Sequence, residues 1–172
     1  MIILVSDTSV LIDLGRGGLL ESAFSCGITM VVPDLLYERE LAAENGPLLR
    51  RLGLGVVVLA PDEVAFAQQL RTRRSSLSLA DCFALSCARR PDHALVTGDW
   101  SLRAEAQVWQ CPVYGLLWIL DQLEASNKTG AEMLHEGLTR ISNHPRCRLP
   151  KAEIATRLQR WQAQSSGRLF KG

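Results

Sequence analysis

The sequence of 172 residues contains few of the side chains that build zinc sites or disulfide frameworks. Its five cysteines form no Cys-x-x-Cys pair, and its three histidines do not have zinc-ligand spacing. An odd number of unpaired cysteines predicts free, buried thiols in a reducing compartment. The sequence therefore favours neither a zinc module nor a disulfide-stapled secreted domain.

Long apolar runs are also missing. The longest, Val113 to Leu120, is much too short to span a membrane and is followed by Asp121. Met1 leads directly into a strand-like segment, so we expect no signal peptide. We therefore expect a cytoplasmic protein that does not bind membranes.

The sequence has no strong excess of one charge, since 19 basic and 18 acidic residues give a net charge of +1. The charges are nevertheless unevenly distributed. Residues 146–172 include seven basic residues and one acidic residue, whereas the residues before them include 12 and 17. An acidic body of about −5 is thus followed by a basic tail of about +6.

Apolar strand-like segments alternate with helix-like segments along most of the chain. The expected strands are residues 1–6, 28–32, 55–60, 93–97 and 112–114. This alternation predicts a three-layer α/β/α fold with a central, mainly parallel sheet of four to five strands. Two further helices, expected at 131–142 and 151–164, predict a C-terminal helical extension. We expect a main domain at residues 1–127 and the extension at residues 128–172.

Four acidic residues lie next to predicted strand ends or helix starts: Asp7, Glu38, Asp81 and Asp99. A parallel α/β fold gathers such positions at the carboxyl edge of its sheet. Four carboxylates there would repel one another unless a hard divalent cation lay among them, and Mg²⁺ and Mn²⁺ prefer such oxygen ligands. The pattern predicts a metal site for hydrolysing a phosphodiester.

Each acid also has a purely structural explanation. Asp7 and Asp99 are suited to cap helices, and Asp81 is suited to offset a helix dipole. The second acid is ambiguous between two positions. Glu38 is preferred because its distance from the strand end would direct it back over the sheet edge, and Glu40, which faces another way, is the alternative.

Other carboxylate-rich or nucleotide-binding folds fit less well. A phospho-acceptor receiver domain would carry a lysine after a late strand, but no lysine occurs between Met1 and Asn127. A phosphatase of the Asp-x-Asp type would need an acid where Ser9 stands. A dinucleotide-binding domain needs glycines between a strand and a helix, and the glycine cluster here follows a helix. A non-catalytic binding or assembly module remains open.

Four segments together resemble the PIN-domain nucleases: VSDTSVLIDL (5–14), VPDLLYEREL (32–41), SLADCFALSCA (78–88) and LVTGDWSL (95–102). The resemblance covers roughly residues 1–125. It implies a metal-dependent endoribonuclease that acts on RNA with Mg²⁺ or Mn²⁺. Such proteins are commonly toxins of bacterial or archaeal toxin–antitoxin pairs, which implies an antitoxin protein as partner.

The resemblance also implies roles for individual residues. The catalytic and metal-binding cluster would be formed by Asp7, Glu38, Asp81 and Asp99. Ser9 and Thr97 would be supporting polar residues near the metal. Basic side chains are needed to guide the phosphate backbone past an acidic site, and the candidates are Arg71, Arg73, Arg74 and Arg103.

The basic tail has two interpretations. Its charges could hold RNA, or its apolar positions Ile154, Leu158 and Trp161 could pack on the body or on a partner while the charges are solvated. The amphipathic spacing favours the second interpretation. Trp161 is also a candidate dimer anchor, and we expect a homodimer.

Overall fold

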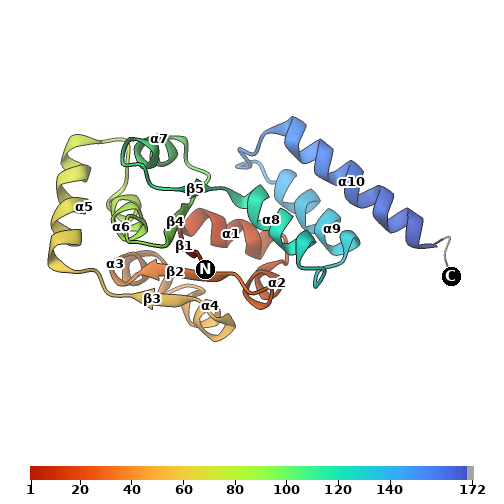
Figure 1. The fold of residues 1–172 in the computed structure, drawn as a ribbon, viewed down its shortest axis with the longest axis horizontal. Coiled ribbons are helices and arrows are strands. Elements are labelled where there is room, and N and C mark those ends of the chain that lie inside the picture. Colours follow the sequence, from red (N-terminus) through yellow and green to blue (C-terminus); the bar gives the residue numbers. More distant parts are fainter. Residues whose placement is uncertain (170–172) are drawn as a thin grey trace.

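The computed structural model describes residues 1–169, which form one five-stranded sheet covered by helices (Figure 1). The strands are β1 (Ile3–Ser6), β2 (Thr29–Pro33), β3 (Gly55–Val57), β4 (His93–Val96) and β5 (Val113–Tyr114). Their order across the sheet is β3-β2-β1-β4-β5, and every neighbouring pair is parallel. The predicted α/β/α fold with a parallel sheet is confirmed.

Strand β1 lies at the centre of the sheet. It pairs with β2 through Leu4 and Met30 and with β4 through Val5 and Leu95. These four side chains are buried, as expected of a strand that is covered by helices on both faces. The carboxyl end of β1 therefore opens at the middle of one sheet edge.

Ten α-helices of the described residues cover the sheet or pack on the helices that do. They are α1 (Thr8–Arg16), α2 (Leu20–Ser25), α3 (Asp34–Leu36), α4 (Gly46–Leu52), α5 (Pro61–Arg73), α6 (Leu79–Ala88), α7 (Trp100–Val108), α8 (Leu116–Ala125), α9 (Ala131–Ser142) and α10 (Lys151–Leu169). Helix α6 contacts β1, β2 and β4, and α5 packs on α6, whereas α1 contacts α2, α8 and α9. No helix of the described residues is long and apolar enough to cross a membrane. All five cysteines are free thiols, as predicted.

A π-helical turn, η1 (Tyr37–Leu41), follows α3 directly. Its signature is the hydrogen bond from the Ala42 amide to the Tyr37 carbonyl, at 2.8 Å and five residues apart. A π turn widens the helix and changes which side chains face a given direction. Predictions that assumed an ordinary α-helix are therefore unreliable between Tyr37 and Leu41.

The C-terminal segment docks on the body of the protein. Helix α9 contacts α1 and α8, and α10 lies along α9 (Figure 1). Helix α10 is longer than expected and continues to Leu169. Ile154 and Trp161 join the same hydrophobic core as the sheet, and the Trp161 side chain is fully buried. The interpretation that the tail packs on the body is confirmed, and Trp161 is not available as a dimer anchor.

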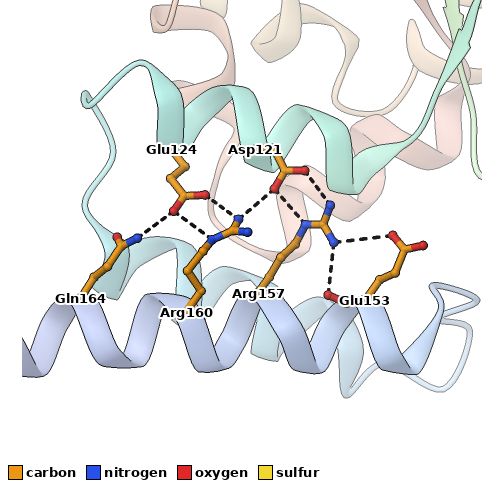
Figure 2. A network of polar contacts seen from close by, with 6 residues as sticks. All are labelled: Asp121, Glu124, Glu153, Arg157, Arg160 and Gln164. Atoms are coloured by element: carbon orange, nitrogen blue, oxygen red, sulfur yellow. Dashed lines mark hydrogen bonds and ion pairs between the residues drawn. The ribbon is translucent and has the colours of Figure 1, made fainter.

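Ion pairs fix α10 to α8 (Figure 2). Arg157 binds both oxygens of Asp121, through Nε at 2.9 Å and Nη2 at 2.6 Å. Arg160 binds Glu124 at 3.1 and 2.5 Å and Asp121 at 3.1 Å, and Gln164 adds a hydrogen bond of 2.9 Å to Glu124. These two arginines are thus paired with acids of the body, which corrects the expectation that the charges of the tail are merely solvated.

Helix α9 packs closely against Leu19 and the Gly17 carbonyl at Gly137, and a substitution there tests this packing. A Cβ at Gly137 would lie 2.6 Å from Leu19 Cδ1 and 2.9 Å from the Gly17 carbonyl oxygen. We expect Gly137→Ala to lower the free energy of unfolding by about 1–3 kcal/mol, because the backbone oxygen must shift. Urea denaturation of both proteins measures this.

Gly167→Ala is the matched control, because nothing lies within 4 Å of its added Cβ on exposed α10. It should leave stability unchanged or raise it by up to about 1 kcal/mol through helix propensity. Equal stability of Gly137→Ala and the wild type would show that α9 is not held against the turn at Gly17.

Candidate active site

Asp7 stands at the carboxyl end of the central strand and begins the first helix. Its amide donates to the Val96 carbonyl at 3.0 Å, which extends the β1–β4 ladder by one step. Its Oδ1 accepts from the Val10 amide at 2.9 Å, so Asp7 is the N-cap of α1. Asp7 therefore does cap the helix, and the same contact holds its carboxylate at the sheet edge.

Two hydroxyls hold the Asp7 carboxylate further. The Ser9 hydroxyl donates to Oδ1 at 2.9 Å, and the buried Thr97 hydroxyl donates to Oδ2. Thr97 also accepts from the Asp99 amide at 3.0 Å. Thr97 thus connects two of the predicted acids, and both predicted supporting residues contact Asp7 directly.

Burial changes the acidity of Asp7, whose exposed fraction is only 5%. Burial is the largest cause that raises the pKa of Asp7, and the negative charge of Asp81 adds to it, whereas the hydrogen bonds from Thr97, Val10 and Ser9 lower it; together they raise the pKa to about 6. Without a cation, this carboxylate is therefore costly to ionise. The effect of Asp81 also shows that the two acids are close enough to interact.

Asp81 and Asp99 occupy the starts of two other helices. Asp81 forms a capping box at α6, in which its Oδ2 accepts from the Ser78 amide at 2.8 Å and its amide donates to the Ser78 hydroxyl at 3.0 Å. Asp99 caps α7, and its Oδ1 accepts from the Leu102 amide at 2.8 Å. In each case the hydrogen bond fixes one carboxylate oxygen and orients the side chain.

These side chains meet in one open cleft of about 690 Å³. The acids that line it are Asp7, Asp13, Glu40, Asp81 and Asp99. Asp13 was not predicted, although it lies four residues after Ser9 and hence on the same face of α1. The structure thus brings together three of the four predicted acids and adds two others.

The second predicted acid is the exception. Glu38 is exposed and is not among the residues lining the cleft, whereas Glu40 lines it and accepts a hydrogen bond from the Thr8 hydroxyl. The reason is the π turn, because its wider winding directs Glu40 rather than Glu38 toward α1. The alternative position is the one that the structure places at the cleft.

A comparison with protein families adds to this geometry. Residues 3–163 match the sequence model of the family DUF3368, described as a PIN domain. The chain belongs to this PIN-domain family. The match continues through α9 and into α10, so it includes most of the segment that follows residue 127.

No curated protein matches the chain. PIN domains are generally nucleases that use divalent metal ions.

The donor set of this PIN domain fits a hard divalent cation. Carboxylates and hydroxyls line the cleft, and within the described chain neither a histidine nor a cysteine is among its lining residues. Helix capping engages one oxygen of Asp81 and one of Asp99, which leaves the second oxygen of each for a cation. Over residues 1–169, however, no three acidic, histidine or cysteine side chains are already close enough to hold a metal. Binding would therefore require carboxylates to turn inward.

The predicted nucleic-acid-binding arginines lie elsewhere, since none of Arg71, Arg73, Arg74 and Arg103 lines the cleft. Arg74 pairs with the buried Glu105 at 2.8 Å. Arg103 donates to the carbonyls of Thr97 and Tyr114, both at 3.0 Å, and so ties β4 to β5. The cationic side chains at the cleft are instead Arg146 and Arg148, from the loop between α9 and α10.

The raised pKa of Asp7 predicts a stability that depends on pH. Between about pH 4 and pH 6 the unfolded chain loses the Asp7 proton while the folded protein retains it, so this residue lowers stability as the pH rises. In EDTA, Asp7→Asn should therefore unfold less readily than the wild type near pH 7, by up to about 3 kcal/mol, and the difference should vanish near pH 4. Urea denaturation at both pH values measures it.

The exposed Asp62, changed to Asn, serves as the control, because removing an exposed carboxylate relieves no desolvation. A wild type that is more stable than Asp7→Asn at neutral pH in EDTA would contradict the argument from burial.

Proposed function

We propose that this PIN domain is a metal-dependent endoribonuclease that hydrolyses RNA phosphodiester bonds in the acidic cleft. The observation that carries the proposal is a buried carboxylate, Asp7, at the carboxyl end of the central strand, in a cleft shared with Glu40, Asp81 and Asp99. Like-charged groups gathered in this way are unfavourable alone and are suited to a cation. Toxin activity within a toxin–antitoxin pair is a further part of the proposal and has support only from the resemblance of the sequence.

The residues of the cleft have distinct roles in this proposal. Asp7 would be the central ligand, because three hydrogen bonds fix its orientation. Asp81 and Asp99 would each offer the oxygen that capping leaves unused. Glu40, oriented by Thr8, would complete the opposite wall. Bound Mg²⁺ or Mn²⁺ would supply an activated water and stabilise charge on the phosphate.

A non-catalytic binding module is the second candidate. It is favoured by the absence, over residues 1–169, of three acids close enough together to hold a metal. The nuclease predicts product formation, whereas a non-catalytic binding or assembly module does not. Cleavage therefore separates them.

The nuclease proposal is tested by cleavage of a mixed RNA pool with Mg²⁺ or Mn²⁺. Asp7→Asn should lower the cleavage rate by more than about 100-fold. Loss of a residue that only hydrogen-bonds to a metal ligand typically costs about 10–100-fold, and loss of a ligand itself should cost more. Glu40→Gln should lower it by at least about tenfold. Gel analysis of labelled RNA over time, with and without EDTA, provides the measurement.

Glu38→Gln is the matched control, since it is the same change two residues away on the same π turn. It should alter the rate by less than about twofold, as is usual for exposed positions. Equal cleavage by wild type and Asp7→Asn would indicate a contaminating nuclease. A metal-loaded, folded wild type that cleaves no RNA would favour the binding module.

An exposed aromatic residue beside the cleft supports a single-stranded substrate. Trp100 directly follows the cleft residue Asp99, and its exposed fraction is 82%. Large exposed aromatic rings are suited to stack on unpaired bases. We infer that Trp100 stacks on a base next to the cleavage site.

Trp100→Ala should therefore raise the KM for single-stranded RNA by about 5–150-fold, the equivalent of about 1–3 kcal/mol of stacking, with little change in kcat. Trp100→Phe should keep part of the effect, because it retains a stacking face. Steady-state cleavage kinetics measure both constants. An unchanged KM in Trp100→Ala would show that the Trp100 ring does not contribute to substrate binding.

A further inference from the structure

The loop between α9 and α10 returns to the acidic cleft. This loop, residues 143–150, contributes Pro145, Arg146, Arg148 and Leu149 to the cleft lining. It belongs to the predicted C-terminal extension, residues 128–172. The cleft is thus built from both parts of the chain.

Side chains alternate along this loop. Cys147 and Leu149 are half-buried and pack against the hydrophobic core, whereas Arg146 and Arg148 are exposed. The two inward side chains hold the loop on the body. Arg146 and Arg148 stay exposed and line the cleft together with their neighbours Pro145 and Leu149.

These guanidinium groups are not engaged elsewhere in the structure. Within residues 1–169, the guanidinium groups of Arg146 and Arg148 form no ion pair or hydrogen bond, although acids line the same cleft; the Arg146 backbone amide donates to His144 Nδ1 at 3.2 Å. Arg157 and Arg160, by contrast, are fully used in binding Asp121 and Glu124 (Figure 2). The cleft therefore contains two available forked donors suited to bind an anion in a bidentate manner.

We propose that Arg146 and Arg148 are the phosphate contacts of the RNA-binding cleft, supplied in cis by the α9–α10 loop. The proposal rests on the function proposed above and adds to it the residues that hold the substrate backbone. An acidic cleft repels a polyanion, so a nuclease of this kind needs cations at the edge of the site. The guanidinium groups would bind phosphates beside the scissile one, while the carboxylates face the reaction.

The surrounding structure holds this loop at both ends. Helix α9 packs on α1, the helix that carries Ser9 and Asp13. Helix α10 is tied to α8 by Arg157 and Arg160 (Figure 2). The ion-paired helix therefore serves as an anchor for the two arginines that face the cleft. This gives the C-terminal segment a part in substrate binding that its packing alone does not explain.

The test is the salt dependence of RNA binding. All proteins carry Asp99→Asn to suppress cleavage, because Asn caps a helix as well as Asp does. Fluorescence anisotropy of a labelled, mixed-sequence single-stranded RNA in Mg²⁺ gives Kd at several salt concentrations. Loss of both arginines, in Arg146→Ala/Arg148→Ala, should weaken binding and reduce the slope of log K against log salt by about 1.4.

Two further variants define the cause. Arg51→Ala/Arg140→Ala removes the same charge from exposed positions that do not line the cleft, and its slope should match that of the parent. Arg146→Lys/Arg148→Lys should keep the slope but bind more weakly, because lysine retains the charge without the fork.

Three results would overturn the proposal. They are an unchanged slope in Arg146→Ala/Arg148→Ala, tighter binding by that variant, and no RNA binding by the parent. Tighter binding would mean that the arginines obstruct the cleft. The nuclease proposal is judged separately, from cleavage by protein with native Asp99. Cleavage with an unchanged slope refutes only the arginine contacts, whereas a reduced slope without cleavage refutes only the enzyme.

Discussion

The burial of one carboxylate at the end of the central strand is the constraint on which the site depends. Asp7 follows β1 immediately, and β1 lies between β2 and β4 in the sheet, so the Asp7 side chain stands at the middle of the carboxyl edge. At that position it is surrounded by apolar strands and would be strongly disfavoured as an anion without its three hydrogen bonds. Ser9 and Val10 supply two of these donors from the helix that follows Asp7, and Thr97 supplies the third from the end of the neighbouring strand β4. The site is thus preorganised by the fold itself.

Capping and catalysis are not competing explanations for these acids. A helix N-terminus fixes one oxygen of Asp81 and one of Asp99, and the same contact restricts the rotamer of the side chain. A carboxylate held in this way loses little further entropy when the other oxygen binds a cation. In the proposed site, the helix starts would therefore hold Asp81 and Asp99 in position to bind a cation. A single Asp at such a position remains weak evidence for a site, and three of them on one sheet edge are stronger evidence.

The sequence predicted the features that depend on local order and on the topology of parallel sheets. The alternation of strands and helices predicted the fold. The ends of predicted strands identified Asp7 and Asp99 as candidate site residues, because strand ends can be recognised from neighbouring residues. Glu40 was less predictable, since a π turn has no clear propensity signal and changes which side chain faces the cleft. Arg146 could not have been placed in the cleft from the sequence, because its position depends on how α9 and α10 dock far from it in the chain. Arg74 and Arg103 were misleading for the same reason, as their partners Glu105 and Tyr114 come from other elements.

The arginines of the basic tail form two groups, Arg157 and Arg160 on α10 and Arg146 and Arg148 on the loop before it. The groups differ in the acidic residues that lie near them. Arg157 and Arg160 face Asp121 and Glu124 on α8 at hydrogen-bonding distance, and such paired charges add little to attraction at long range. Arg146 lies in a cleft whose acids have other partners, since Asp13 pairs with Arg16 and Asp7, Asp81 and Asp99 cap helices, and over residues 1–169 its charge is not compensated by direct contact. A segment of uniform basic composition therefore performs two functions in the fold, anchorage along α10 and an open cationic edge at the loop. The two groups differ in whether an acid pairs with them: Asp121 and Glu124 form ion pairs with Arg157 and Arg160, whereas over residues 1–169 no acid of the cleft pairs with Arg146 or Arg148.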